Sequence, residues 1–171
     1  MFKVLDEVCE PTRGSKYSAC VDVYAREDIT IGAGETKLVG LGIKIDLEKL
    51  YKNWFCITER GIGNKTSWEV FLKSHYLQLM IRSSSVVKGL MIGNGVGVID
   101  LDFPDEIKMI IHNPLSDIDE IGIRFGVKNR PRIEIKKGDK IAQITLLEHK
   151  SYLFGIDTDE ERKGGFGSTG I

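Results

Sequence analysis

The sequence predicts an all-β domain, and three of its features carry that prediction. Apolar residues alternate with polar residues or glycine along several segments, which is typical of strands with one buried face. Glycine-rich stretches separate these segments at short intervals, as turns do in sandwiches and barrels. A chain of 171 residues has the size of one domain and can bury a core without disulfides.

Strands are expected in four regions of the chain. Residues 37–47 alternate as one strand, with glycine, lysine and aspartate between the apolar positions. Residues 76–83 and 97–103 repeat this alternation, although the second of these runs carries two aspartates that a strand does not favour. Residues 132–148 form two short strands around a Lys-Lys-Gly-Asp turn.

One helix interrupts the strand pattern. Trp68, Phe71, Leu72 and His75 are spaced i, i+3, i+4 and i+7, which places them on one helical stripe. Residues 46–55 are compatible with a second, shorter helical turn.

Composition and charge exclude several function classes. The formal net charge is -1, so the chain lacks the basic footprint of a nucleic-acid binder. Cys9, Cys20 and Cys56 are widely spaced and odd in number, which argues against a disulfide framework or a structural zinc site. Without an apolar run long enough for a membrane span or a leader, we expect a soluble, cytoplasmic protein that binds neither nucleic acid nor membrane.

Five short segments carry polar residues or glycines that a strand scaffold does not require. Each one alone is more typical of ordinary surface or turn chemistry, and the glycine-rich end is more typical of a disordered terminus. In chain order the segments are Ala19-Cys20-Val21-Asp22-Val23, Ile81–Ser85, Asn94–Asp105, Gly138–Gln143 and Gly164–Gly170.

In this order and combination, the segments resemble the five motifs of the trimeric dUTPase family, the dUTP nucleotidohydrolases. The family motifs read close to AGYDL, PRSGL, NxxGVIDxDYRG, GDRIAQ and GGFGSTG, and the last is unaltered here. The resemblance implies an all-β, dUTPase-like fold, a β-barrel or jelly roll (β-clip) with one or two short inserted helices. Residues 1–161 would form this domain. Residues 162–171 would form a flexible arm that closes over the active site of a neighbouring subunit in a homotrimer.

The resemblance also implies an activity, the hydrolysis of dUTP to dUMP and pyrophosphate. This reaction limits uracil incorporation into DNA and supplies dUMP for thymidylate synthesis. Asp100 would be the catalytic base that deprotonates the water attacking the α-phosphorus. Mg²⁺ would be the cofactor, held mainly by the phosphates, with Asp22 acting indirectly through a metal-bound water.

The implied substrate contacts divide by the part of dUTP that they bind. Backbone groups of the third motif would read uracil, and Phe103 would lie under the deoxyribose and exclude a 2′-hydroxyl. Placed donors would bind the phosphates, and the arm would cover the base and the γ-phosphate. The implied substrate-binding residues are Arg82, Ser83, Ser84, Asn94, Gly97, Val98, Ile99, Phe103, Lys108, Gln143, Arg162, Phe166, Gly167, Ser168 and Thr169.

Several positions depart from the family pattern. Ser84 replaces a glycine, and its N–H can still donate provided that φ is negative there. Phe103 replaces a tyrosine, which keeps a steric wall and loses a hydroxyl. Pro104-Asp105 replaces Arg-Gly, and we expect the acids Asp105 and Glu106 to face solvent.

Two stretches, residues 50–76 and 114–131, are longer than the family needs. We expect each to pack on the edge of the barrel as a lid, the first burying Trp68 and Phe71. The alternative is a surface that binds a protein partner.

Two other functions are compatible with the same fold. A dCTP deaminase needs a glutamate on the strand after the hairpin, where this chain has Ile110, and that family lacks GGFGSTG. A purely regulatory protein would not need Asp100, Arg82 and Gln143 together with an intact fifth motif. The dUTPase interpretation is therefore preferred, and a regulatory second role stays open.

Overall fold

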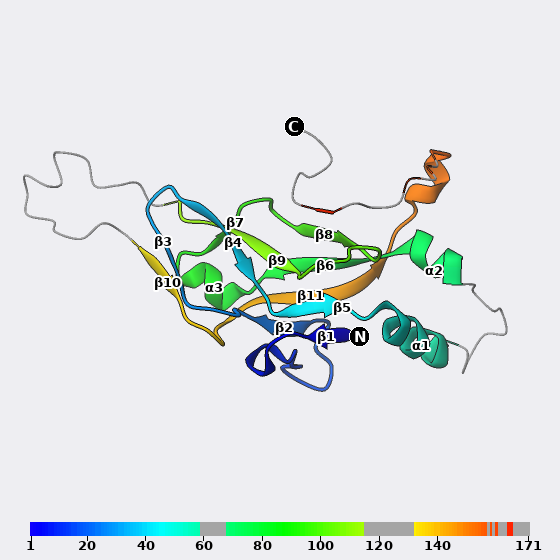
Figure 1. Ribbon diagram of the computed structural model, residues 1–171, viewed down its shortest axis with the longest axis horizontal. Coiled ribbons are helices and arrows are strands. Elements are labelled where there is room, and N and C mark those ends of the chain that lie inside the picture. The colour runs from blue at the N-terminus through cyan, green and yellow to red at the C-terminus, as the bar shows by residue number, and fades with distance from the viewer. Residues whose placement is uncertain (59–67, 115–131, 157, 159, 161–163, 166–171) are drawn as a thin grey trace, which may run out of the picture.

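The computed structural model describes residues 1–58, 68–114, 132–156, 158, 160 and 164–165 (Figure 1). This part of the chain is mostly β, as predicted. Its strands are β1 (Phe2–Val4), β2 (Val21–Tyr24), β3 (Ile29–Ile31), β4 (Thr36–Gly40), β5 (Ile43–Ile45), β6 (His75–Ile81), β7 (Met91–Ile92), β8 (Gly97–Asp100), β9 (Lys108–His112), β10 (Ile133–Ile135) and β11 (Lys140–Glu148). Its helices are α1 (Leu47–Thr58), α2 (Trp68–Ser74) and α3 (Ser83–Val87), with 3-10 turns at Glu7–Cys9 (η1) and Ser151–Phe154 (η2).

The described strands form four hydrogen-bonded sheets rather than one closed barrel. The largest has the order β2-β11-β6-β8, and the next has the order β4-β9-β7. The pairs β1-β5 and β10-β3 complete the set. The long strand β11 pairs with β2 on one side and with β6 on the other, so it joins parts of the chain that are far apart in sequence.

One continuous hydrophobic core joins the sheets. Alternate residues of β6 and β11 enter it, among them Leu79 and Ile144, which are each 2% exposed. Met109 and Ile111 of β9 enter it fully buried. This is the burial that the period-2 pattern predicts for strands with one face against the core.

The run predicted as one strand over residues 37–47 is two strands, because the chain turns at Gly42. Its φ is +62°, and a Cβ there would lie 2.5 Å from the Cys9 sulfur. Glu106 accepts a hydrogen bond from the Gly42 N–H at 2.8 Å and pairs with Arg26 at 3.1 Å. The expectation that Glu106 faces solvent is therefore wrong, whereas Asp105 is exposed as expected.

The helices of the first lengthened stretch differ from the prediction in extent. The short turn expected over residues 46–55 is the three-turn helix α1, and the later helix ends at Ser74 so that His75 begins β6. Phe71 is fully buried as expected, with its ring 4.9 Å from Trp54 and 4.7 Å from His75. Trp68 is 39% exposed, so its predicted burial is wrong; its ring meets the Tyr51 ring at nearly a right angle, with centroids 5.0 Å apart. Nearly all of residues 114–131 lie outside the described part.

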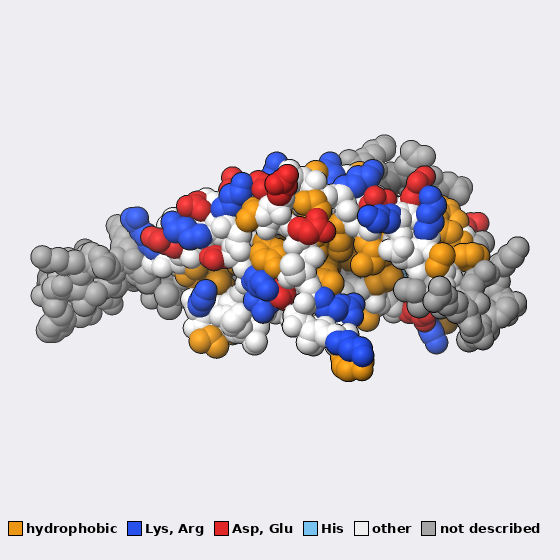
Figure 2. Space-filling view, turned by 90° about the horizontal axis from the view of Figure 1, so that it is seen from below, with side chains coloured by type: hydrophobic (Ala, Val, Ile, Leu, Met, Phe, Trp, Pro, Cys, Tyr) orange, Lys and Arg blue, Asp and Glu red, His pale blue; other side chains and the backbone are white. Residues whose placement is uncertain are grey.

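The surface agrees with the near-neutral net charge. On the face shown in Figure 2, basic and acidic side chains are interspersed. Within the described residues, no helix has the length and apolar character needed to cross a membrane.

Candidate functional site

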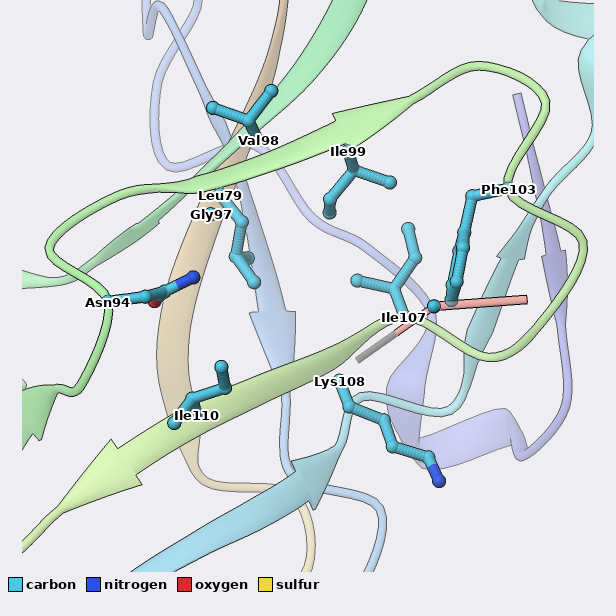
Figure 3. Close-up of a pocket in the computed structure, with 10 residues that line it drawn as sticks. Leu79, Asn94, Gly97, Val98, Ile99, Phe103, Ile107, Lys108 and Ile110 are labelled. Carbon is cyan, nitrogen blue, oxygen red and sulfur yellow. The ribbon is translucent and has the colours of Figure 1, made fainter. Parts of the chain in front are cut away.

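A pocket of about 210 Å³ lies beside the hairpin that joins β8 to β9 (Figure 3). We call it the hairpin pocket. Six of the predicted substrate-binding residues line it, namely Asn94, Gly97, Val98, Ile99, Phe103 and Lys108. Leu79, Ile107, Ile110 and Gly165 complete its walls. Residues that the sequence predicts to bind one ligand therefore line one cavity.

The walls of the hairpin pocket are mainly apolar, with a few polar groups at its sides. Asn94 lies on one side and Phe103 on the other, while the Lys108 side chain extends away from Asn94 (Figure 3). A Cβ on Gly97 would lie 3.0 Å from the Leu79 Cβ, so β8 approaches β6 closely at the back of the pocket. An apolar cavity with few directed polar groups is typical of a small-molecule site.

The glycine-rich end of the chain reaches the same pocket. A Cβ on Gly165 would lie 2.5 Å from Cε2 of Phe103, a distance that leaves no room for a side chain. Glycine therefore allows the backbone to lie directly against the ring. The other predicted residues of this segment, Arg162, Phe166, Gly167, Ser168 and Thr169, lie outside the described residues.

A charged cluster forms where β2, β6 and β11 meet. Asp22 of β2 is 8% exposed, and its Oδ1 pairs with Nε of Arg82 at 2.9 Å. Its Oδ2 pairs with Nζ of Lys140 at 3.4 Å. We call Asp22, Arg82 and Lys140 the cation pair site, because one carboxylate holds two cations.

The other residues predicted to bind phosphate surround the cation pair site. Gln143 lies directly opposite Asp22 in the β11–β2 register, and its Nε2 donates to the Ile81 carbonyl at 3.5 Å. Ser83 and Ser84 follow Arg82 as the exposed first residues of α3. The helical backbone gives Ser84 a negative φ, so the condition for its N–H to replace a glycine N–H is met.

Asp100 lies away from the cation pair site. It is the exposed last residue of β8 and pairs with Tyr76 at the start of β6, whereas Arg82 follows the end of β6. Its side chain lines a second cavity of about 540 Å³, together with Asp102 and His75. Arg82 follows Tyr76 by six positions in the chain, which corresponds to about 20 Å at roughly 3.3 Å per residue. Within the described residues, the predicted base and Arg82 therefore lie far apart in one chain.

His75 is a buried titratable group that lines the same cavity as Asp100. Its pKa is lowered, chiefly because burial disfavours the charged imidazolium. Its Nδ1 lies 3.1 Å from the Phe71 carbonyl, and its Nε2 lies 3.7 Å from Glu148. The His75 ring therefore connects α2, through the Phe71 carbonyl, to the start of β6, where Tyr76 pairs with Asp100.

Lys140 is the charged residue of this region that sequence reasoning missed. It occupies the arginine position of the fourth motif, and its charge was the available signal.

Comparisons with known proteins agree on one family. A family model described as dUTPase matches residues 65–170. A deoxyuridine 5'-triphosphate nucleotidohydrolase of Candida albicans is 31% identical over 94% of this chain and 80% of its own length. The enzyme of the same name from Saccharomyces cerevisiae is 29% identical over 94% of this chain and 86% of its own length.

Solved structures of the same kind share the fold. The dUTPase of Staphylococcus bacteriophage 80alpha with dUPNHPP superposes with a TM-score of 0.62, at 20% identity, over 100% of this chain and 98% of that one. A dUTPase from Streptococcus mutans gives a TM-score of 0.59, at 21% identity, over 92% and 98%.

Proposed function

The chain belongs to the dUTPase family, and from this premise we propose how its residues hydrolyse dUTP to dUMP and pyrophosphate. The observation that carries the proposal is the hairpin pocket, where six residues expected to contact the nucleoside lie together. A dCTP deaminase is disfavoured because Ile110, at the position where a deaminase needs its glutamate, is an aliphatic wall of this pocket.

The hairpin pocket would hold uracil and deoxyribose. Backbone N–H and C=O groups of Gly97, Val98 and Ile99 would pair with the base, and the Asn94 side chain would assist. A 5-methyl group would collide with the close walls, so thymine is rejected by steric exclusion. Phe103 would form the floor under the sugar and leave no space for a 2′-hydroxyl, and Lys108 would contribute at the rim.

The phosphates would bind at the cation pair site. Arg82 supplies a guanidinium that is held in place by Asp22, and Gln143 supplies an amide on the same sheet. Ser83 and Ser84 add hydroxyl and N–H donors at the start of α3. Charge-assisted hydrogen bonds from such fixed groups stabilise the charge that develops on the phosphates during hydrolysis.

Asp100 would act as the catalytic base, taking a proton from the water that attacks the α-phosphorus. Along β6, Asp100 and Arg82 are separated by about 20 Å, which exceeds the combined reach of their two side chains, on the order of 10 Å. We therefore propose that each active site combines the hairpin pocket and Asp100 of one subunit with the cation pair site of another. A homotrimer with three equivalent interfaces satisfies this requirement.

Mg²⁺ would enter with the substrate. A hard cation of this kind takes oxygen ligands and is usually bound through substrate phosphates, waters and one or two carboxylates. Asp22 supplies a carboxylate beside the proposed phosphate donors, and its oxygens already hold two cations, which fits an indirect contact through water. When bound, the ion would neutralise part of the phosphate charge.

Residues 162–171 would close the occupied site as an arm, with Phe166 over the base and Arg162, Gly167, Ser168 and Thr169 near the γ-phosphate. Gly165 lies against Phe103 of its own chain, which supports a contact of this segment with the sugar side of a hairpin pocket. Closure over a neighbouring subunit, a cytoplasmic location and a protein partner of residues 50–76 or 114–131 stay predictions.

The test is pyrophosphate release from dUTP, dCTP, dTTP and UTP with Mg²⁺. We expect strong preference for dUTP, and Asp100→Asn should lose about 10²-fold or more of turnover while still binding a non-hydrolysable dUTP analogue. Asp105→Asn is the matched control, because this exposed acid lies in the same hairpin. Ammonia release from dCTP would overturn the proposal.

A further inference from the structure

The first residues of β11 contain a β-bulge. Lys140 pairs with Tyr24 and Ala142 pairs with Val23, so Ile141 is an extra residue relative to β2. Ile141 and Ala142 are both buried although they are consecutive, as expected when a bulge interrupts the alternation. The bulge therefore changes the face of the sheet to which the side chain before it, that of Lys140, belongs.

The bulge places Lys140 on the same sheet face as Gln143. Residues three apart in a regular strand point to opposite faces. Here Lys140 is opposite Tyr24 and Gln143 is opposite Asp22, and these two partners are two residues apart on β2 and so share a face. Bulges that redirect a side chain are frequent beside active sites.

The ammonium of Lys140 is held in place and remains accessible. Its Nζ lies 3.4 Å from Asp22 and 5.6 Å from the centroid of the Tyr24 ring, while its side chain is 43% exposed. The Tyr24 hydroxyl is hydrogen-bonded to Thr12 at 2.5 Å, which fixes the ring. A cation that is already positioned loses less conformational entropy when it binds a ligand.

The charges on this face favour an anion. Two cations, Arg82 and Lys140, share the single carboxylate of Asp22, which leaves one positive charge in excess within the cation pair site. An ammonium has three N–H donors and no acceptor, and its ion pair with Asp22 uses one of them. A phosphate oxygen is the acceptor that this arrangement suits.

We infer that Lys140 is a further substrate-binding residue, which contacts the terminal phosphates of dUTP together with Arg82 and Gln143. Asp22 is then a positioning residue for both cations. This inference rests on the proposed function, because it takes its ligand from it. The competing explanation is that Lys140 serves the fold alone, as a partner of Asp22.

Chemical accessibility of the amine separates the two explanations. The full-length protein is acylated at its lysines with or without α,β-imido-dUTP, and separately with dUMP, and each lysine is quantified by mass spectrometry. We expect the triphosphate analogue to lower the reactivity of Lys140 at least severalfold, whereas dUMP leaves it unchanged. Lys136 is the internal reference, because it lies on the adjacent turn and is 62% exposed. Unchanged reactivity of Lys140 with saturating analogue overturns the inference.

Substitution supplies the second measurement. Lys140→Met removes the ammonium and keeps an unbranched apolar stem, and it should weaken binding of the analogue by on the order of tenfold while changing dUMP affinity less than about twofold. Lys140→Arg restores a cation and should recover most of the affinity, and Lys136→Met should change neither ligand. Equal losses for dUMP and the analogue would show a structural role instead.

Calorimetry on the wild-type chain keeps the two proposals apart. If wild type does not bind the analogue, the proposed function fails. If wild type binds it tightly and Lys140→Met binds it equally well, only the assignment of Lys140 fails.

Discussion

Active sites shared between subunits should be restored by mixing two inactive variants. Arg82→Ala removes the guanidinium of the cation pair site, and Asp100→Asn removes the base. Their positions are about 20 Å apart along β6, and the two side chains together reach back by only on the order of 10 Å. The carboxylate and the guanidinium of one chain therefore stay on the order of 10 Å apart.

The activity expected of the mixture follows from the fraction of sites that receive both an intact arginine and an intact aspartate. In a 1:1 mixture of the two variants with random assembly, each site takes its arginine from one chain and its aspartate from another. Each is intact in half of the chains, so about a quarter of the sites are complete. The assay is steady-state dUTP hydrolysis after co-refolding, with distinct affinity tags to verify mixed oligomers. Each variant alone should have almost no activity.

A second mixture checks the same reasoning independently. A chain with both substitutions, mixed 1:1 with wild type, should give about a quarter of wild-type turnover if the residues come from different subunits. It should give about half if both residues come from one subunit. Mixed oligomers without regained turnover in the first experiment, together with half activity in the second, would refute the shared site.

Three further predictions concern the arm, the inserted helices and pH. Removing residues 162–171 should reduce turnover sharply and leave the midpoint of thermal unfolding nearly unchanged, because a glycine-rich segment stabilises the fold little. Phe71→Ala should lower the free energy of unfolding in urea by about 3–5 kcal/mol, since Phe71 is fully buried, whereas Val70→Ala, at a 52% exposed position, should cost much less. Burial lowers the pKa of His75, so the folded state binds its proton less readily than the unfolded state, whose histidine titrates near 6.5. The free energy of unfolding should therefore fall as pH decreases below about 6.5, and His75→Asn should remove part of that loss; an identical pH dependence in both proteins would contradict the assignment.

Period-2 alternation predicted β6, β10 and β11 well, because each has one face in the core. The break between β4 and β5 could not be predicted from this pattern, since apolar residues alternate through Gly42 without interruption. Its causes are long-range: the Cys9 side chain approaches the Gly42 backbone, and Glu106 accepts the Gly42 N–H. Neither contact leaves a local signal.

The site shows the same division between local and long-range information. The hairpin pocket draws seven of its residues from a single stretch between Asn94 and Lys108, and a motif within one stretch is visible in sequence. The proposed role of Lys140 depends on a one-residue shift in its pairing with β2, whereas a regular strand would place Lys140 and Gln143 on opposite faces. The position of Asp100 depends on its register with Tyr76, which no motif encodes.

The register of β6 supports the proposal that two chains contribute to one site. Leu77 and Leu79 are each 2% exposed, and β6 is paired on both sides, by β11 and by β8. A buried strand with both edges hydrogen-bonded bends little, so the distance between Asp100 at its start and Arg82 beyond its end is fixed by the fold. Under this proposal the site is completed by the docking of chain copies, so substitutions at the subunit interface should reduce turnover as much as substitutions in either half-site. A substitution that separates the copies should abolish hydrolysis while both half-sites stay folded.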